Sequence, residues 1–220
     1  IKDFFIEQAD IILQLKPLFM KKLIEDNEEN LFFDIEMPLV DVLLSMEREG
    51  VRIDTDVLKQ YSNELEKERQ DLEQKIYALA GVEFNISSPK QLGEVLFERL
   101  DINNGKKAKK TKTKQFSTSE DVLEKLIFSH PIVPMILEYR SITKLKSTYI
   151  DALPLLINKK TGKIHTTFNQ AITATGRLSS TNPNLQNIPI RTERGKEIRK
   201  AFIPSDNDHL LLSSDYSQIE

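Results

Sequence analysis

Apolar residues in the first third of the chain recur every three to four positions, which is the spacing of one helix face. This pattern predicts a helix within "EQADIILQLKPLFMKKLIEDNEEN", whose acidic end indicates a linker, and a second helix at Ile35–Glu49 that ends at Gly50. A long amphipathic helix is predicted at Thr55–Ala80, with Gly81 as its stop and a dense Glu, Lys and Arg face. We expect this helix to pack against an antiparallel partner.

The middle of the chain predicts three further helices. Ser88 has the place of an N-cap, Pro89 the first helical position and Gln91 the capping-box position. The stretch "STSEDVLEKLIF" predicts a short capped helix, and a longer one is expected from about Ile132 to Tyr149. The apolar face of the longer helix consists of Ile136, Ile142, Leu145 and Tyr149, and another face carries Arg140, Lys144 and Ser147.

The pattern changes character after Pro154. Apolar and β-branched residues on both sides of Lys-Thr-Gly-Lys predict a hairpin, and "LLLSS" predicts a buried strand that leads to Asp215. Between them lie a polar stretch at 171–187 and a basic segment at 191–200. The predicted fold is mainly α with a small α+β part: a helical body with a long amphipathic helix pair, then a hairpin and one strand of an incomplete sheet.

Composition limits the class of protein. The chain is 39% hydrophobic and 30% charged, has a net charge of −3, and contains no cysteine, which excludes disulfides and thiolate metal sites. No apolar stretch approaches the roughly 18 residues of a membrane span, and no signal peptide is evident at Ile1. We expect a soluble protein of a reducing compartment, and a piece of something longer. The three histidines lack metal-site spacing, so structural roles are expected.

Six lysines concentrate in "DINNGKKAKKTKTKQ" at residues 101–115, which has almost no apolar residue and predicts a mobile loop. A charge run of this kind is ordinarily a solvated surface. Together with Arg140, Lys144 and Ser147 on one helix face, the same lysines favour a helical arm that follows a phosphate backbone without reading its sequence.

The stretch "TATGRLSSTNPNLQNIPIR" is too polar for a core and lacks the Lys and Glu of an ordinary solvated helix face. Its Arg, Asn and Gln side chains donate hydrogen bonds, and its Gly and Pro residues fix the backbone. Such donors suit the minor groove, where every correct base pair presents acceptors at similar places. An ordered loop whose amides bind the local backbone explains the composition equally well.

Asp215 also has two interpretations. A carboxylate at a strand end is most often a turn or cap residue. Phosphoryl transfer needs hard oxygen ligands for two Mg²⁺ ions, and Asp215 with the carbonyl oxygen of Tyr216 could supply two of them. A second carboxylate is needed for such a site, and none follows Glu220 in the chain.

Six stretches together resemble the family A DNA polymerases, the bacterial DNA polymerase I type. They are "IEMPLVDVLLSMEREGVRID", "SSPKQLGEVLFE", "LEYRSITKLKSTYIDALP", "TATGRLSSTNPNLQNIPIR", "IRKAFIPSD" and "DYSQIE". Their order and spacing are near those of the family, and the resemblance covers essentially the whole chain.

The resemblance implies roles for individual residues. Asp215 matches the first catalytic aspartate, a metal ligand, and Glu220 matches a glutamate that helps exclude a ribose 2′-hydroxyl; Tyr216 and Gln218 belong to the same nucleotide site. Arg177 matches the arginine that reaches the minor groove at the primer end. The other implied DNA contacts are Asn184, Gln186, Asn187, Arg191, Arg140 and Lys144, with Lys106, Lys107, Lys109 and Lys110 at the tip.

The implied activity is that of a DNA-directed DNA polymerase of replication and repair, a nucleotidyltransferase with two Mg²⁺ ions. Its implied partners are primer–template DNA and deoxynucleoside triphosphates, with no membrane; a monomer in the bacterial cytoplasm is expected. The implied domains are an end helix of a 3′-5′ exonuclease-like domain at 1–33, a thumb at 34–154 with its tip at 101–116, and the start of the palm at 155–220.

Two departures from the family pattern qualify this expectation. Phe4 and Gln8 stand where proofreading members have a tyrosine and a metal-binding aspartate, and an amide oxygen replaces a carboxylate poorly, so we expect no proofreading at this site. The fingers and the second catalytic aspartate are missing, so the chain is not expected to polymerise alone. The alternative function is a non-catalytic helical DNA-binding or scaffold module that acts through the lysine tip.

Overall fold

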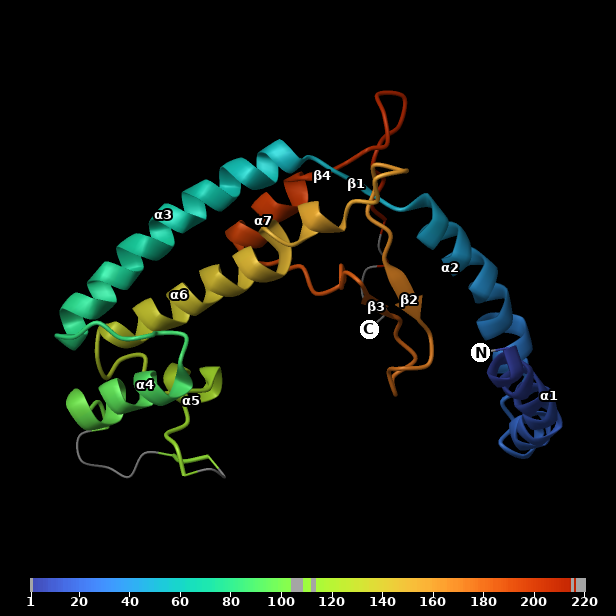
Figure 1. Ribbon diagram of the computed structural model, residues 1–220, viewed down its shortest axis with the longest axis horizontal. Coiled ribbons are helices and arrows are strands. Elements are labelled where there is room, and N and C mark those ends of the chain that lie inside the picture. The colour runs from blue at the N-terminus through green and yellow to red at the C-terminus, as the bar shows by residue number, and fades with distance from the viewer. Residues whose placement is uncertain (1, 104–108, 112–113, 215, 217–220) are drawn as a thin grey trace. The chain divides into compact units, whose positions relative to one another are not determined.

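The computed structural model describes residues 2–103, 109–111, 114–214 and 216, and the chain divides into two compact units (Figure 1). The first unit consists of Ile1–Val51 and Lys163–Asn187. The second consists of Arg52–Gly162 and Ile188–Glu220. Residues 1, 104–108, 112–113, 215 and 217–220 lie outside the description. The implied domain boundaries stay a prediction.

The first unit contains two long helices and a small hairpin. Helix α1 (Lys2–Glu25) is followed by the π-helical segment η1 (Leu31–Glu36) and helix α2 (Met37–Glu49). Strands β2 (Thr167–Asn169) and β3 (Ser179–Thr181) pair antiparallel, with Phe168 opposite Ser180. The predicted end of α2 is confirmed, because Gly50 has φ +62° and its amide donates to the carbonyl oxygen of Met46.

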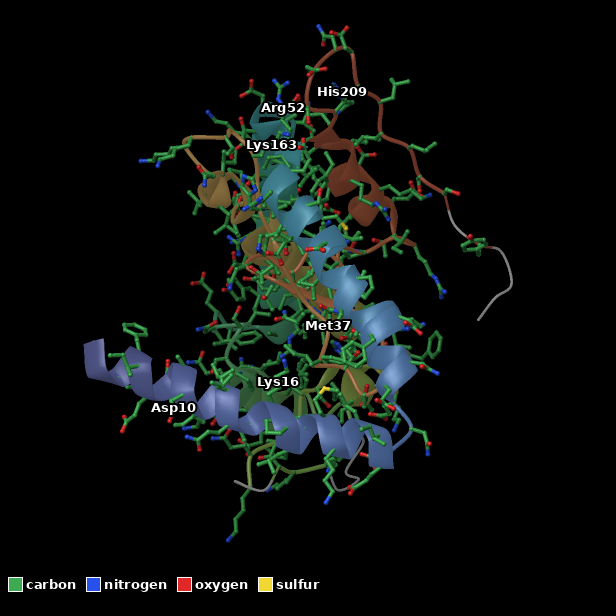
Figure 2. All side chains as sticks on the ribbon, turned by 90° about the vertical axis from the view of Figure 1, so that its right-hand side faces the viewer. Asp10, Lys16, Met37, Arg52, Lys163 and His209 are labelled. Atoms are coloured by element: carbon green, nitrogen blue, oxygen red, sulfur yellow. The ribbon has the colours of Figure 1, made fainter. Side chains whose placement is uncertain are left out.

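Most apolar side chains of α1 are exposed, among them Ile12, Leu13 and Phe19. Figure 2 shows the helix with Asp10 and Lys16 labelled, and with side chains projecting from it along its length. A groove of about 1060 Å³ follows this apolar surface and is lined by residues of α1, η1 and the start of α2. None of the helices in the described ranges has both the length and the hydropathy of a membrane span.

The second unit is built on an antiparallel helix pair, as predicted. Helix α3 (Thr55–Ala80) runs beside α6 (Ile132–Leu145), and the π-helical segment η3 (Lys146–Ile150) continues α6 (Figure 1). Leu58, Ile76, Ile136 and Ile142 are fully buried, so the apolar stripes that the sequence predicts do form the core. Asp54 caps α3 by accepting hydrogen bonds from the amides of Asp56 and Val57 at 2.9 and 3.1 Å.

Shorter elements complete the second unit. At one end of the pair lie α4 (Pro89–Glu94), the π-helical segment η2 (Val95–Arg99) and α5 (Glu120–Glu124). A 3₁₀ turn, η4 (Leu153–Leu156), follows α6 and η3. Near the other end, α7 (Glu193–Lys200) lies between α3 and α6, and β4 (Phe202–Ile203) pairs with β1 (Arg52–Ile53) (Figure 1).

The predicted class, mainly α with a small β part, is confirmed, but two local predictions are wrong. Lys-Thr-Gly-Lys does not join the strands of a hairpin, because Leu153–Leu156 is helical and Ile164 instead pairs with Val51. The hairpin of this region is β2–β3. Leu210–Ser213 has no strand structure, because it pairs with no described residue, and Leu210 and Leu212 are more than nine-tenths exposed.

Candidate nucleic-acid interface

A cleft lined mainly by hydroxyl-bearing and basic residues lies between α6 and the segments around α4 and α5. Its volume is about 610 Å³. The predicted residues Arg140, Lys144 and Ser147 all face it, which brings this set together as the sequence indicated. The other lining residues were not predicted from the sequence: Ser87, Pro89, Thr111, Gln115, Phe116, Ser117, Thr118, Ser119 and Thr143.

Hydroxyl groups of the segment before α5 line one wall of the cleft. Ser119 is the N-cap of α5 by position, but its side chain makes no capping hydrogen bond. Its Oγ lies 3.3 Å from Ser117 Oγ instead. The "STSE" stretch therefore supplies hydroxyl donors to the cleft. In the sequence, the same residues indicate only the start of a helix.

Arg140 joins α6 to this wall. Its Nη2 lies 3.2 Å from Thr118 Oγ1, and its Nη1 donates to the Thr118 carbonyl oxygen. Burial lowers the pKa of Arg140, and Glu120 acts in the opposite direction; an arginine keeps its charge at neutral pH in either case. Arg140 thus gives the cleft a fixed positive charge, while the exposed Lys144 beside it is the more accessible cation.

The base of the lysine loop is attached to the same cleft. Lys110 pairs antiparallel with Phe116, and its Nζ lies 4.8 Å from the centroid of the Phe116 ring. That ring packs against Phe97 at a centroid distance of 5.2 Å. A Cβ on Gly93 would lie 2.9 Å from Phe116 Cβ, so only glycine allows this close approach. Lys109 and Lys110 therefore have an ordered base, whereas Lys106 and Lys107 lie outside the described residues.

The predicted minor-groove residues form a second polar surface, in the first unit. Arg177 is exposed just before β3, and Asn184, Gln186 and Asn187 are exposed on the loop that follows β3. Asn184 Oδ1 accepts hydrogen bonds from the amides of Gln186 and Asn187 at 3.2 and 3.3 Å. The expectation that amides of this stretch bind the local backbone is therefore correct for the Asn184 oxygen. The side chain of Gln186 remains exposed.

Two buried hydroxyls that were not predicted from the sequence hold this loop. Ser180 Oγ accepts from the amides of Leu185 and Gln186 at 3.1 and 3.3 Å. Thr166 Oγ1 lies 2.7 Å from the Pro183 carbonyl oxygen and 3.1 Å from that of Thr181. These bonds fix the backbone that carries Asn184 and Gln186, so the amide side chains are presented from a rigid turn.

Arg191 lies in the second unit, just before α7, and is exposed. Thr192 caps α7 by accepting the Gly195 amide at 3.1 Å.

Arg194 is paired with Glu68 and Glu138. Burial lowers the pKa of Arg194, but the hydrogen bonds to Glu138 and Glu68, together with the negative charges of these glutamates, oppose it, and the net change in the pKa is upward.

The predicted catalytic site falls mainly outside the described residues. Asp215, Gln218 and Glu220 are among those not described, and Tyr216 is 83% exposed. Within the described ranges, no three His, Cys, Asp or Glu side chains are grouped as metal ligands would be. His130 Nδ1 accepts the Ile132 amide at 3.2 Å, and His165 Nδ1 lies 2.8 Å from the Glu47 carbonyl oxygen, so both histidines have structural contacts.

Comparison with known proteins decides the family. The model of DNA polymerase family A matches residues 55–220, which is well over half of the chain. The chain belongs to DNA polymerase family A. It is 50% identical over 218 residues to DNA polymerase I of Geobacillus stearothermophilus, and 52% identical over 213 residues to that of Bacillus subtilis strain 168. These matches cover 99% and 97% of this chain but only 24% of each relative, so the chain spans about a quarter of their length.

A solved structure supports membership of this polymerase family. The POL domain of Pol1 from M. smegmatis, in complex with DNA primer-template and dNTP, has a TM-score of 0.77 and 41% sequence identity with this chain. The match covers 87% of this chain and 33% of the other. The resemblance that the sequence motifs indicated is therefore confirmed at the level of family and fold.

Proposed function

We propose that the chain is the DNA-holding thumb and the first part of the palm of a DNA-directed DNA polymerase of replication and repair. The observation that carries the proposal is the α6 cleft, where Arg140, Lys144 and Ser147 face the hydroxyl-rich wall before α5 in a chain of family A. Cations and hydroxyls are the groups that contact DNA phosphates without reading sequence.

The cleft residues would have different roles in binding a duplex. Arg140 is held by Thr118, so it shapes the wall and supplies charge. Lys144, Lys109 and Lys110 are exposed, and they would contact phosphates directly, joined by Lys106 and Lys107 of the loop. Ser117 and Ser119 would donate hydroxyl hydrogen bonds to phosphate oxygens.

The second polar surface would contact the minor groove at the primer end. Gln186 is exposed on the loop that Ser180 and Asn184 fix, and Arg177 is exposed just before β3. Donors on a rigid turn can test for acceptors common to all correct base pairs. Asn184, Asn187 and Arg191 belong to the same proposed set of contacts with primer and template.

The proposed chemistry is nucleotidyl transfer. The primer 3′-hydroxyl oxygen attacks the α-phosphate of a deoxynucleoside triphosphate; the new P–O bond forms as the bond to pyrophosphate breaks. Asp215 and the Tyr216 carbonyl oxygen are hard oxygen donors suited to Mg²⁺, and two such ions would stabilise the charge of the transferring phosphate. Tyr216, Gln218 and Glu220 would hold the incoming nucleotide. Monomeric state and bacterial cytoplasmic location are parts of the same proposal.

DNA binding by the chain tests the cleft. Fluorescence anisotropy of a labelled primer–template duplex should give a dissociation constant about three- to fivefold larger for Lys144→Gln than for the native chain. The slope of log affinity against log salt concentration should become less steep by roughly 0.9, the value for one lost phosphate contact. The matched control is Lys75→Gln, which removes an exposed lysine of α3 outside the cleft. Equal effects of the two variants would contradict the proposal, because they would reflect net charge alone.

A further inference from the structure

Arg194, in the first turn of α7, joins three helices. Its Nη2 atom lies 2.8 Å from Glu138 Oε1 on α6 and also contacts Glu68 Oε1 on α3. The Arg194 side chain is 26% exposed, and each glutamate is 44% exposed. We call these three residues the Arg194 cluster. Through it, one side chain connects the start of α7 to both members of the long helix pair.

The other cations of α7 that form ion pairs do not make such connections. Lys196 pairs with Glu193 at 2.6 Å, and Lys200 pairs with Glu197 at 2.6 Å, in each case three residues away on the same helix. Exposed pairs of that kind contribute little to stability. Among the ion pairs of α7 in the described residues, those of Arg194 alone reach other helices.

Arg191, a proposed DNA contact, lies on a short stretch that is fixed on both sides. Ile188 before it is buried. A Cβ on Gly195 would lie only 2.2 Å from the Pro189 carbonyl oxygen, so the first turn of α7 is pressed against the backbone of that stretch. The stretch and the first turn of α7 are therefore in close contact, so a side chain that holds that turn can also position Arg191.

We propose that Arg194 is a positioning residue for Arg191: by binding Glu68 and Glu138, it holds the Arg191 stretch in a fixed place beside the helix that carries Arg140 and Lys144. This inference rests on the proposed function, because it assumes that Arg191 contacts DNA. Arginine suits the role, since its planar guanidinium can serve two carboxylates at once, whereas a lysine provides a single point charge.

A double-mutant cycle on DNA binding tests the proposal with the 220-residue chain and a labelled primer–template duplex. Arg191→Gln should weaken binding about fivefold in the native background but less than twofold in the Arg194→Gln background, where Arg191 is no longer held in place. Lys196→Gln is the matched control: it removes one positive charge from the same helix, and the Arg191→Gln effect should remain about fivefold in it. Arg194→Lys, a milder variant, should fall between native and Arg194→Gln.

The outcomes separate this inference from the proposed function. If Arg191→Gln weakens binding equally in all backgrounds, Arg191 contacts DNA but the positioning role is overturned. If Arg191→Gln has no effect in any background, both the DNA contact and the positioning role are overturned.

A second cycle without DNA checks that the cluster exists in solution. Arg194→Gln and Glu138→Gln should each lower the unfolding midpoint, and the double variant should lower it by less than the sum of the two. Full additivity would overturn the inference, because it would mean that the two side chains do not interact.

Discussion

Arg140 and Thr118, 22 positions apart in the chain, are joined by two hydrogen bonds: the Arg140 guanidinium donates to both the carbonyl oxygen and the hydroxyl oxygen of Thr118. Thr118 is buried, and these bonds connect α6 to the segment that precedes α5. The cleft proposed to hold DNA therefore keeps its shape partly through a residue that also supplies its charge.

Replacing Arg140 should affect both stability and binding. Arg140→Gln leaves Thr118 without its partner, and we expect a loss of about 1–3 kcal/mol in the free energy of unfolding, measured by urea denaturation. Duplex affinity should fall as well. Lys125→Gln, which removes an exposed cation after α5, should leave stability within about 0.5 kcal/mol of native. A stable Arg140→Gln variant with native affinity would contradict the assignment.

Two glycines with positive φ angles should respond differently to alanine. Gly50 and Gly162 have φ +62° and +69°, but a Cβ on Gly50 would lie 2.7 Å from the Ile164 carbonyl oxygen, whereas Gly162 has open space. Gly162→Ala should cost about 1 kcal/mol for the left-handed backbone. Gly50→Ala should cost about 1–3 kcal/mol more, because the chain must shift. Equal midpoints in thermal unfolding would contradict the packing at Gly50.

Stability at acid pH should depend on Glu66. The hydrogen bond from Arg69 lowers the pKa of Glu66 below its ordinary value of 4.5, and burial opposes this effect. The folded carboxyl thus binds its proton less readily than the unfolded one. Its contribution to stability is present above about pH 4.5 and is lost as the pH falls through the lower, folded pKa.

Glu66→Gln should therefore lower the thermal midpoint at neutral pH, and the gap from the native chain should shrink as the pH falls below 4.5. Glu98→Gln, at an exposed position for which no such hydrogen bond is found in the described residues, is the control. A gap that stays constant from pH 7 to pH 3 would contradict the role of Glu66.

Local signals predicted the helices well. The spacing of apolar residues and the stop glycine gave Thr55–Ala80 with the bounds that the structure has. The capping box at Ser88 formed only in part: Ser88 Oγ accepts the Gln91 amide at 3.5 Å, but Gln91 Oε1 accepts the Asn85 amide instead of that of Ser88. Helices are readable in this way because the signals lie within a few residues of each other.

Contacts between distant segments were not predictable. Ile164 pairs with Val51, so the turn at Lys-Thr-Gly-Lys joins no hairpin. Arg194 is 126 positions from Glu68 and 56 from Glu138, and no spacing in the sequence indicates either pair. Only the α6 residues of the cleft were predicted. The other wall includes 116–119, and the sequence does not show that this segment packs against α6. Sequence alone gave the residue types of the site and left the tertiary pairing open.

Proofreading should be absent at the site that includes Phe4 and Gln8. Both residues lie on α1, and neither offers the carboxylate that a two-metal nuclease site needs. A full-length family A polymerase carrying this segment should not shorten a mismatched primer in Mg²⁺ without nucleotides. A matched primer serves as the control for contaminating nucleases. Rapid Mg²⁺-dependent excision of the mismatch would contradict the prediction.

We propose that this chain is part of a nucleotidyl-transferring polymerase. This proposal is tested most directly by primer extension with a full-length family A polymerase that carries this sequence over the matched segment. The native protein is compared with Asp215→Ala, and duplex binding is measured for both. We expect Asp215→Ala to bind DNA with near-native affinity but to extend primers at least about a thousandfold more slowly, because a metal ligand is lost. Normal extension by Asp215→Ala would contradict the claim and would favour a DNA-holding module without catalysis.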